Sequence, residues 1–332
     1  MRPLKVFVFD YVMEGGLMTR ALPRSVTQQG AMLFNALLAD LAAVPGVEVC
    51  TMATLCVPGT GALAARSFDE RFASCVQAAD AVWPLAPESE GLLEGLSRDI
   101  LRGKRILLGS APGAVRVAAS KLKVARALAE GGVATVPTYR PHAALPNGDG
   151  AWVVKPEDGA GCLDTRLFSD RAAALAWIRT NAAQGYVLQP FIAGKLGSLS
   201  LICCDGAARL LACNEERMAV LDNRFHFLGS TVNGLLDADG AFERLAQQVA
   251  AALPTLWGYV GVDIILGQGG AMVLDVNPRL TAAYAGLHAS IGGNPAALVI
   301  DLLKGPAALP APPAARRVVS VDVASFAADA AT

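Results

Sequence analysis

Residues 261–279 constrain the fold and the chemistry of this chain more than any other stretch. Two apolar runs flank a Gly-Gln-Gly-Gly segment, and this pattern predicts a β-hairpin. Because strand side chains alternate between two faces, Asp275, Asn277 and Arg279 are expected to point the same way. Asp263 can join that face only if it lies opposite Asp275 in the hairpin.

The register of the hairpin therefore decides whether these polar side chains form one site. The midpoint between Asp263 and Asp275 is residue 269, so their opposition requires a loop of odd length or a bulged turn at residues 268–270. Carboxylates on an otherwise apolar strand are costly to bury unless something pairs with them, and a hard divalent cation does so. The alternative is a surface hairpin whose acids are solvated.

Composition and charge exclude several classes of protein. The chain has 332 residues, is 53% hydrophobic and 17% charged, and carries a net charge of −1, which indicates a globular protein of two or three packed units. No basic stripe invites nucleic acid or an anionic membrane, and no apolar run reaches the roughly 18 residues of a membrane span. Seven cysteines without C-x-x-C spacing argue against disulfides and zinc. We expect a cytoplasmic protein.

The first third of the chain alternates strands with helices, which predicts a parallel sheet with helices on its faces. Strands are expected at residues 4–10, 47–51, 79–84 and 105–109, and a helix at residues 26–43 that buries Leu33, Leu37 and Leu41. The chain has neither the G-x-G-x-x-G motif of dinucleotide sites nor a P-loop. Residues 1–110 are predicted to form this N-terminal α/β domain.

The rest of the chain is predicted to be α+β with mainly antiparallel pairing. A helix is expected from Ser120 to Gly131, and Asp205-Gly206 predicts a tight hairpin turn. Further strands are expected at residues 152–155, 186–192, 198–203, 208–214 and 317–323, and further helices at residues 169–183, 241–253 and 295–303. We place a central subdomain at residues 111–186 and a C-terminal subdomain at residues 187–332.

Lys155 ends an apolar strand and is followed at once by a glycine-bearing loop, Pro-Glu-Asp-Gly-Ala-Gly. Glycines let backbone N–H groups approach oxygens closely, and the ammonium adds positive charge, so the motif suits phosphate binding. The alternative is a lysine that merely closes a strand. Lys121, in the first turn of its helix, could likewise be an ordinary surface lysine.

Two further segments leave alternatives open. Gln189-Pro190-Phe191-Ile192 predicts an edge strand, because Pro190 cannot donate to a ladder, but it could also offer backbone hydrogen bonds and an apolar wall to a purine. The polar residues 214–233 could line or cover a substrate cleft, or form a solvated connection.

The order of these motifs resembles the ATP-grasp superfamily of carboxylate–amine ligases. The resemblance rests on Lys121, the Lys-Pro-Glu-Asp-Gly-Ala-Gly loop, the Gln-Pro-Phe-Ile segment and the final Asp-Val-Asn-Pro-Arg. It extends from the first strand to about residue 304. It implies an ATP-grasp fold preceded by a Rossmann-like, parallel-sheet pre-ATP-grasp domain, which combines the α/β and α+β classes.

The resemblance also implies roles for individual residues. Lys121 and Lys155 would contact the α- and β-phosphates of ATP, and Asp263, Asp275 and Asn277 would hold one or two Mg²⁺ (or Mn²⁺) ions. Arg279, with Lys155, would be catalytic and neutralise the transferring phosphoryl group. The loop Asp158, Gly159, Ala160, Gly161 and Cys162 would close over the phosphates, and Gln189, Pro190, Phe191 and Ile192 would form the adenine hinge.

Within the superfamily, the chain is most similar to the ligases that join tyramine to L-glutamate in methanofuran-type cofactor biosynthesis. This similarity implies phosphorylation of the glutamate γ-carboxyl and attack by an aromatic amine on the acyl phosphate. Substrate-binding residues are expected at Asp10, Gly15, Gly16, Arg217 and Tyr284, with the loop after the first strand at the carboxyl end of the parallel sheet.

Other activities stay open at this point. Another ATP-grasp ligase, forming a dipeptide or a D-alanine or glutathione-like product, would share the same motifs. A nucleotide-binding protein without catalysis is the alternative from another class. The expected partners are small molecules, with neither nucleic acid nor a membrane, and the sequence leaves open whether the chain forms a homodimer.

Overall fold

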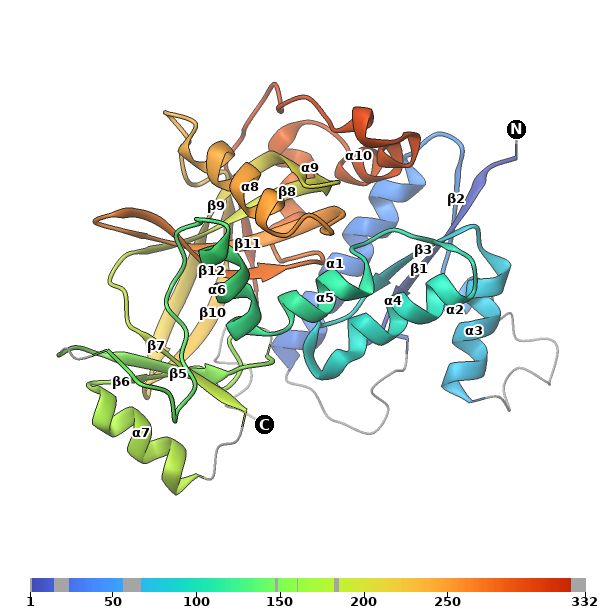
Figure 1. The fold of residues 1–332 in the computed structure, drawn as a ribbon. Helices are drawn as coiled ribbons and strands as arrows, with labels where there is room; N and C mark the ends of the chain where they lie inside the picture. Colours follow the sequence, from blue (N-terminus) through green and yellow to red (C-terminus); the bar gives the residue numbers. More distant parts are fainter. Residues whose placement is uncertain are drawn as a thin grey trace.

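The computed structural model describes residues 2–14, 24–55, 67–146, 149–159, 161–181 and 185–323 (Figure 1). These residues form two sheets, which lie toward opposite ends of the molecule in Figure 1. Sheet A has four parallel strands in the order β2-β1-β3-β4, as the alternation of strands and helices predicted. Its strands are β1 (Leu4–Asp10), β2 (Val47–Cys50), β3 (Ala81–Leu85) and β4 (Ile106–Leu107).

Sheet A is buried on both faces. Val6 and Val8 of β1 pack toward the α1 side, where Leu37 and Leu41 are fully buried. Phe7 and Phe9 of the same strand point the other way, into a core shared with α3 and α4. The helices beside this sheet are α1 (Arg24–Ala42), α2 (Met52–Leu55), α3 (Phe68–Ala78), α4 (Leu92–Arg102) and α5 (Pro112–Ala118). Helices on both faces explain the continuous apolar runs of its strands.

Sheet B contains nine strands in the order β12-β11-β8-β9-β10-β6-β5-β7, with β13 beside β10. Its pairs are antiparallel, as predicted for the second part of the chain. The strands are β5 (Trp152–Pro156), β6 (Arg166–Phe168), β7 (Tyr186–Pro190), β8 (Lys195–Cys204), β9 (Ala207–Leu221), β10 (Arg224–Val232), β11 (Gly258–Gly267), β12 (Gly270–Asn277) and β13 (Val319–Asp322).

One face of sheet B is apolar and covered by helices. Leu199, Leu201, Val262 and Ile264 share a core with buried side chains of α6 and α8. Asp263 lies between two of these residues in sequence, so it points to the other face. The helices that follow α5 are α6 (Lys121–Glu130), α7 (Arg171–Thr180), α8 (Ala241–Ala252), α9 (Tyr284–Ile291) and α10 (Pro295–Asp301).

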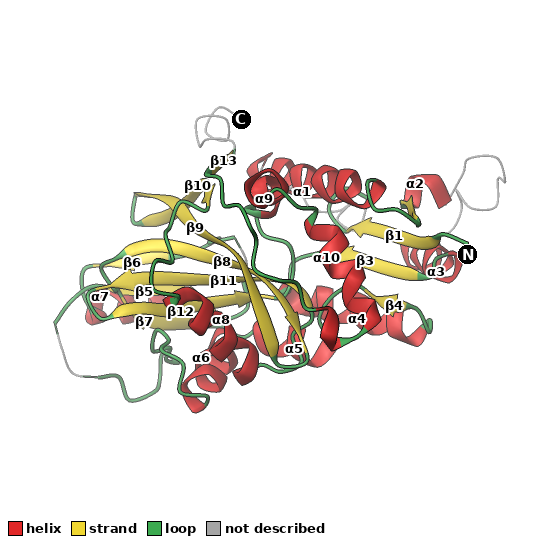
Figure 2. Ribbon diagram, turned by 90° about the horizontal axis from the view of Figure 1, so that it is seen from above, coloured by secondary structure: helices red, strands yellow, loops and turns green. Residues whose placement is uncertain are grey.

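The strands β5, β6 and β7 with α7 make a small lobe at one end of sheet B (Figures 1 and 2). Its core contains Trp152, Val154, Ile178 and Leu188. The strand β7 is the last strand of the sheet, so the predicted edge position of Pro190 is confirmed.

The core on the α1 side of sheet A also joins the two sheets. Val8 and Trp83 of sheet A share it with Tyr259 of sheet B and with Tyr284 and Leu287 of α9. The sequence analysis did not predict α9, because a short helix that is apolar on nearly all sides gives no 3.6-residue periodicity. Helix α5 and the short strand β6 were missed as well.

Two local predictions need correction. Residues 214–233 are not a connection: they lie mostly in β9 and β10, which pair as a hairpin across Asp222 and Asn223. Helix α7 begins at Arg171, two residues later than predicted, after Asp170, whose carboxylate accepts a hydrogen bond from the Ala173 backbone. The tight turn at Asp205-Gly206 is confirmed, with positive φ at both residues. Across the described ranges, every helix is too short or too polar to cross a membrane.

Candidate functional site

The hairpin β11–β12 places Asp263 directly opposite Asp275, as predicted. The predicted irregularity at the turn is wrong, however. Gly267 pairs with Gly270, which leaves an even, two-residue turn and gives Gly270 a φ of +103°. The register shifts instead beside Asp263, where Leu274 is the extra residue of a β-bulge. The bulge, one residue from Asp275, brings the two acids onto one face.

These acids form a compact polar cluster with Asn277. The side-chain amide of Asn277 donates to Asp263 Oδ2 at 3.0 Å, and Gly261, opposite Asn277, leaves room on this face for Thr281. Burial raises the pKa of Asp263 to about 6, and the charge of Asp275 adds to the shift. The cluster therefore holds more negative charge than its surroundings favour without a cation.

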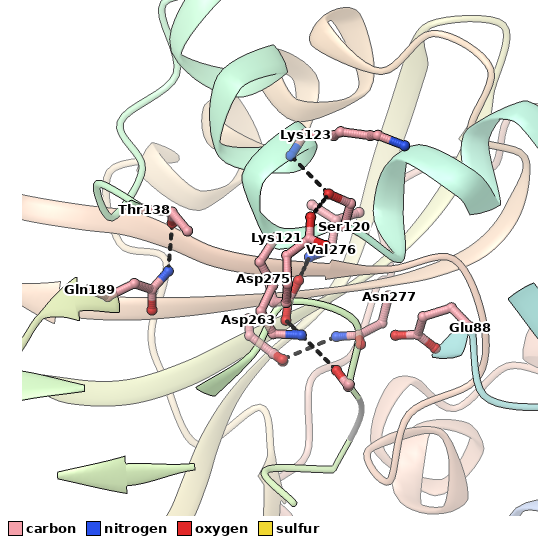
Figure 3. A network of polar contacts seen from close by, with 12 residues as sticks. Glu88, Ser120, Lys121, Lys123, Thr138, Gln189, Asp263, Asp275, Val276 and Asn277 are labelled. Atoms are coloured by element: carbon pink, nitrogen blue, oxygen red, sulfur yellow. Dashed lines mark hydrogen bonds and ion pairs between the residues drawn. The ribbon is translucent and has the colours of Figure 1, made fainter. Parts of the chain in front are cut away.

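Two buried lysines, Lys121 and Lys155, lie near this cluster on other elements, and Figure 3 shows Lys121 beside Asp275. Lys121 Nζ lies 3.6 Å from Asp275 Oδ2 and donates to the Gly159 carbonyl at 2.6 Å. Its position is fixed by the start of α6, where Ser120 caps the helix and its hydroxyl also donates to the Glu157 carboxylate. The Lys121 backbone N–H donates to the Glu157 carbonyl, so α6 is docked onto the end of β5.

Lys155, at the end of β5, is 6% exposed. Burial lowers the pKa of its ammonium to about 8; the charge of Asp275 opposes this shift and that of Lys121 adds to it. Two neighbouring buried ammonium groups repel each other unless anions lie between or beside them. The site thus has the charges that a polyanion would need.

The glycine loop borders the same cluster. Gly159 accepts the hydrogen bond from Lys121, and Gly161 and Cys162 both have a left-handed backbone, with φ of +67° and +59°. Asp158 accepts a hydrogen bond from the Glu90 backbone at 2.8 Å, which ties the loop to the segment after β3. Ala160, also predicted to bind phosphate, lies outside the described residues.

Arg279 is held by an acid that the sequence analysis did not identify. Its guanidinium forms an ion pair with Glu88, from the segment between β3 and α4, and donates to Asn277 Oδ1 at 3.3 Å. Glu88 is 5% exposed and lies 191 residues from Arg279 in the chain. No local motif marks Glu88, because only the packing of sheet A beside the hairpin brings the two side chains together (Figure 3 shows Glu88 beside Asn277).

The predicted adenine hinge lies at the edge strand. The Gln189 amide is buried and donates to the Thr138 hydroxyl at 2.8 Å (Figure 3). The backbone N–H of Phe191 donates to the Ala151 carbonyl, and the Phe191 ring is 41% exposed. Ile192 lies next to Gly267 of the site hairpin. An exposed aromatic ring and a nearby aliphatic side chain are suited to a flat apolar ligand.

The predicted substrate-binding residues are more dispersed. Asp10 ends β1 and accepts hydrogen bonds from the Val12 and Met13 backbones, while Gly15 and Gly16 lie outside the described residues. The guanidinium of Arg217 binds Val321 and Asp322 of β13. Tyr284 is 1% exposed and donates to Asp40 of α1. Within the described part of the chain, none of these contacts joins the hairpin cluster.

The donor set of the cluster fits a hard divalent cation. Two carboxylates and an amide oxygen are ligands that Mg²⁺ accepts, and burial, to which the charge of Asp275 adds, raises the pKa of Asp263. Asn277 Oδ1 already accepts a hydrogen bond from Arg279, but a carbonyl oxygen has a second lone pair for a cation.

Comparison with known proteins defines the family. The ATP-grasp domain family matches residues 118–283, which is half of the chain, and the pre ATP-grasp 3 domain family matches residues 59–115. The chain therefore belongs to the ATP-grasp family, as its motifs indicated, and its two sheets correspond to the fold that this family implies.

Individual proteins resemble the chain with sequence identities below 30%. It is 28% identical over 203 residues to tyramine–L-glutamate ligase from Methanocaldococcus jannaschii, a match that covers 61% of this chain and only 56% of that protein. An ATP-grasp superfamily protein from Archaeoglobus fulgidus has a TM-score of 0.68 and 24% identity, with 90% and 88% of the two chains covered. D-alanine–D-alanine ligase from Bacillus anthracis, complexed with ATP, has a TM-score of 0.62 and 15% identity, with 91% and 96% covered.

Proposed function

We propose that this chain is an ATP-dependent ligase that joins a carboxylate to a primary amine. One observation carries the proposal: two buried lysines, Lys121 and Lys155, converge from α6 and β5 on the acids of the β11–β12 hairpin. Buried positive charges beside buried carboxylates form a site that a metal-bound triphosphate would complete, since it brings both the missing cation and the missing anions. Membership of the ATP-grasp family supports this assignment.

Each residue then has a role that its position allows. Lys121 and Lys155 bind the α- and β-phosphates, and the loop Asp158, Gly159, Ala160, Gly161 and Cys162 covers the β- and γ-phosphates. Gln189, Pro190, Phe191 and Ile192 border the adenine. Asp263, Asp275 and Asn277 would hold one or two Mg²⁺ ions, whose chemistry is to neutralise phosphate charge. Arg279, with Lys155, neutralises the γ-phosphoryl group during transfer.

The reaction proceeds in two steps. A carboxylate oxygen of the substrate attacks the γ-phosphorus, the bond to the β-γ bridging oxygen breaks, and ADP leaves with an acyl phosphate remaining. The amine nitrogen then attacks the acyl carbon, the carbon–oxygen bond to phosphate breaks, and the nitrogen loses a proton. Splitting the condensation in this way replaces one difficult step by two easier ones.

For the substrates we propose the γ-carboxyl of L-glutamate and tyramine. The similarity to tyramine–L-glutamate ligase supports this choice, and it would place the chain in methanofuran-type cofactor biosynthesis. Other amino acid pairs are the alternative, because ligases of different substrates share this fold.

The test is ADP release in a coupled assay with Mg²⁺-ATP, L-glutamate and a panel of amines. We expect ADP formation that requires both glutamate and tyramine, with γ-glutamyltyramide as the product by mass spectrometry. Release only with D-alanine or with other amino acid pairs would reject the glutamate–tyramine assignment and retain the ligase. ATP binding without ADP release under any pair would reject the ligase.

A further inference from the structure

A row of polar side chains crosses the inner face of sheet B from the proposed metal site. Asp275 pairs with Asp263, Asp263 with Ser198 of β8, and Ser198 with Asn214 of β9. Directly paired residues in a sheet point to the same face, so these four side chains lie on one face. The opposite face is the apolar one that packs on α6 and α8.

Glu216 extends this row. It lies two residues after Asn214 on β9, so it shares the same face, and it pairs with Ser230 of β10. The Ser198 hydroxyl donates to Glu216 Oε1, and the Ser230 hydroxyl donates to the same oxygen at 3.2 Å. The carboxylate is therefore oriented by one strand on each side.

The second oxygen of Glu216 is free. Oε2 is buried, and no described residue forms a hydrogen bond with it, whereas the other buried unpartnered side-chain atoms of the described residues are all arginine Nε atoms. A buried acceptor without a donor lowers stability, because it has lost its hydrogen bonds to water. Burial raises the pKa of Glu216 to about 7, and the charge of Asp263 adds to the shift. A cationic donor would relieve both the unpaired oxygen and the repulsion.

We propose that Glu216 binds the primary ammonium group of a substrate. Strand β9 lies two strands from β11, which is about 10 Å across the sheet. This separation suits an amino acid whose γ-carboxyl lies near the hairpin while its α-ammonium lies at Glu216; an acceptor amine held at Glu216 would have to leave it to attack the acyl phosphate. The inference rests on the proposed ligase function, which provides two sources of an ammonium: the acceptor amine and the α-ammonium of the amino acid.

Glu215 offers a matched control. It is the neighbouring acid on β9, points to the other face, and forms an ion pair with Lys195 at 2.8 Å. Glu215→Gln removes the same charge from the same strand without touching the polar row.

The experiment measures ligand affinity by calorimetry for the wild-type protein, Glu216→Gln and Glu215→Gln in the presence of Mg²⁺ and a non-hydrolysable ATP analogue. The probes are tyramine with its amine-free analogue 4-ethylphenol, and L-glutamate with glutarate, which lacks the α-ammonium. We expect Glu216→Gln to weaken one ammonium probe at least about tenfold, or about 1.4 kcal/mol, and to leave 4-ethylphenol and glutarate unchanged. The probe whose affinity falls shows whether the bound ammonium belongs to the amine or to the amino acid.

Equal affinity of wild type and Glu216→Gln for both ammonium probes would overturn the proposal. Equal losses for the neutral analogues would also do so, because they indicate a structural role, and so would failure of the wild type to bind either ammonium probe. Ser230→Ala, which removes one donor to Glu216 Oε1, keeps the test valid if Glu216→Gln does not fold; we expect a smaller loss, about threefold, for the same probe.

Failure of this inference is distinguishable from failure of the ligase assignment. Amine-dependent ADP release with unchanged amine and glutamate KM in Glu216→Gln would leave the ligase and remove the role of Glu216. Ammonium binding that depends on Glu216, without ADP release for any substrate pair, would keep the role of Glu216 and reject the ligase assignment.

Discussion

The two sheets of this protein bury very different chemistry. In sheet A, Val6, Phe7, Val8 and Phe9 have no exposed surface, and helices cover both faces. In sheet B, one face is equally apolar, but the other carries Asp263 and Glu216 with raised pKa values. A parallel sheet covered on both sides has room for polar groups only at strand ends, whereas an antiparallel sheet with one face only partly covered can carry a site along its strands.

The comparison has an energetic side. Apolar burial in sheet A stabilises the fold at about 25 cal/mol per Å². The polar face of sheet B reduces stability, because charges there have been removed from water without full compensation. Substitutions in the two sheets should therefore separate function from stability.

The largest effect is expected at the proposed metal site on sheet B. Asp275→Ala should reduce Mg²⁺-dependent ADP formation by at least about 10³-fold, because it removes a carboxylate beside the transferring phosphate. The free energy of unfolding should change little, since the repulsion with Asp263 disappears while the ion pair with Lys121 is also lost. Steady-state kinetics and urea denaturation measure the two quantities. Asp301→Ala, at an exposed acid paired with Lys304, is the control. Unchanged turnover in Asp275→Ala would reject the proposal that Asp275 helps to bind a metal ion.

The core of sheet A should respond in the opposite way. Phe9 has no exposed surface, and its ring lies 4.8 Å from that of Phe72. Phe9→Ala should lower the free energy of unfolding by about 3–5 kcal/mol, because it leaves a cavity. Calorimetric ATP affinity at low temperature should be unchanged. Leu236→Ala, at a side chain 84% exposed, should have nearly no effect on stability. A large loss of ATP affinity in Phe9→Ala would contradict the separation of the two sheets.

The contact between the sheets is tested at the Glu88–Arg279 ion pair. Glu88→Gln leaves the Arg279 guanidinium, 18% exposed, without its acid, and should lower the free energy of unfolding by about 2–4 kcal/mol. The exposed pair Arg126–Glu130 is the matched control: Glu130→Gln should change stability by less than about 0.5 kcal/mol. Similar effects of the two substitutions in urea denaturation would show that burial does not strengthen the Glu88 contact.

The smallest effect concerns Glu14, which follows the end of β1. Glu14 accepts a hydrogen bond from the Met52 backbone, and burial raises its pKa from 4.5 to about 7. Between about pH 4.5 and 7 the unfolded chain has released this proton while the folded chain retains it, so the free energy of unfolding should fall as pH rises. The expected loss from Glu14 is about 1–3 kcal/mol.

Glu14→Gln should abolish that contribution, so its stability relative to wild type should improve as pH rises from 4.5 to 8. Urea denaturation across this range measures the difference. A difference between the two proteins that does not depend on pH would contradict the raised pKa of Glu14.

Much of the fold followed from local patterns. Continuous apolar runs predicted the strands of sheet A, and Leu33, Leu37 and Leu41 predicted the buried face of α1, because strand and helix periodicities are local properties. The Asp205-Gly206 turn was predicted for the same reason. The boundaries at residues 110 and 186 stay predictions, as do the roles of the individual site residues.

The sequence by itself determined a hairpin that carries Asp263 and Asp275, with two lysines and a glycine loop before it, because alternation and order are written along the chain. The tertiary structure decided the bulge at Leu274, which sets how the hairpin brings the two acids opposite each other. It also decided the partner of Arg279 and the free oxygen of Glu216. These features depend on contacts between distant segments, which packing selects and local periodicity does not encode.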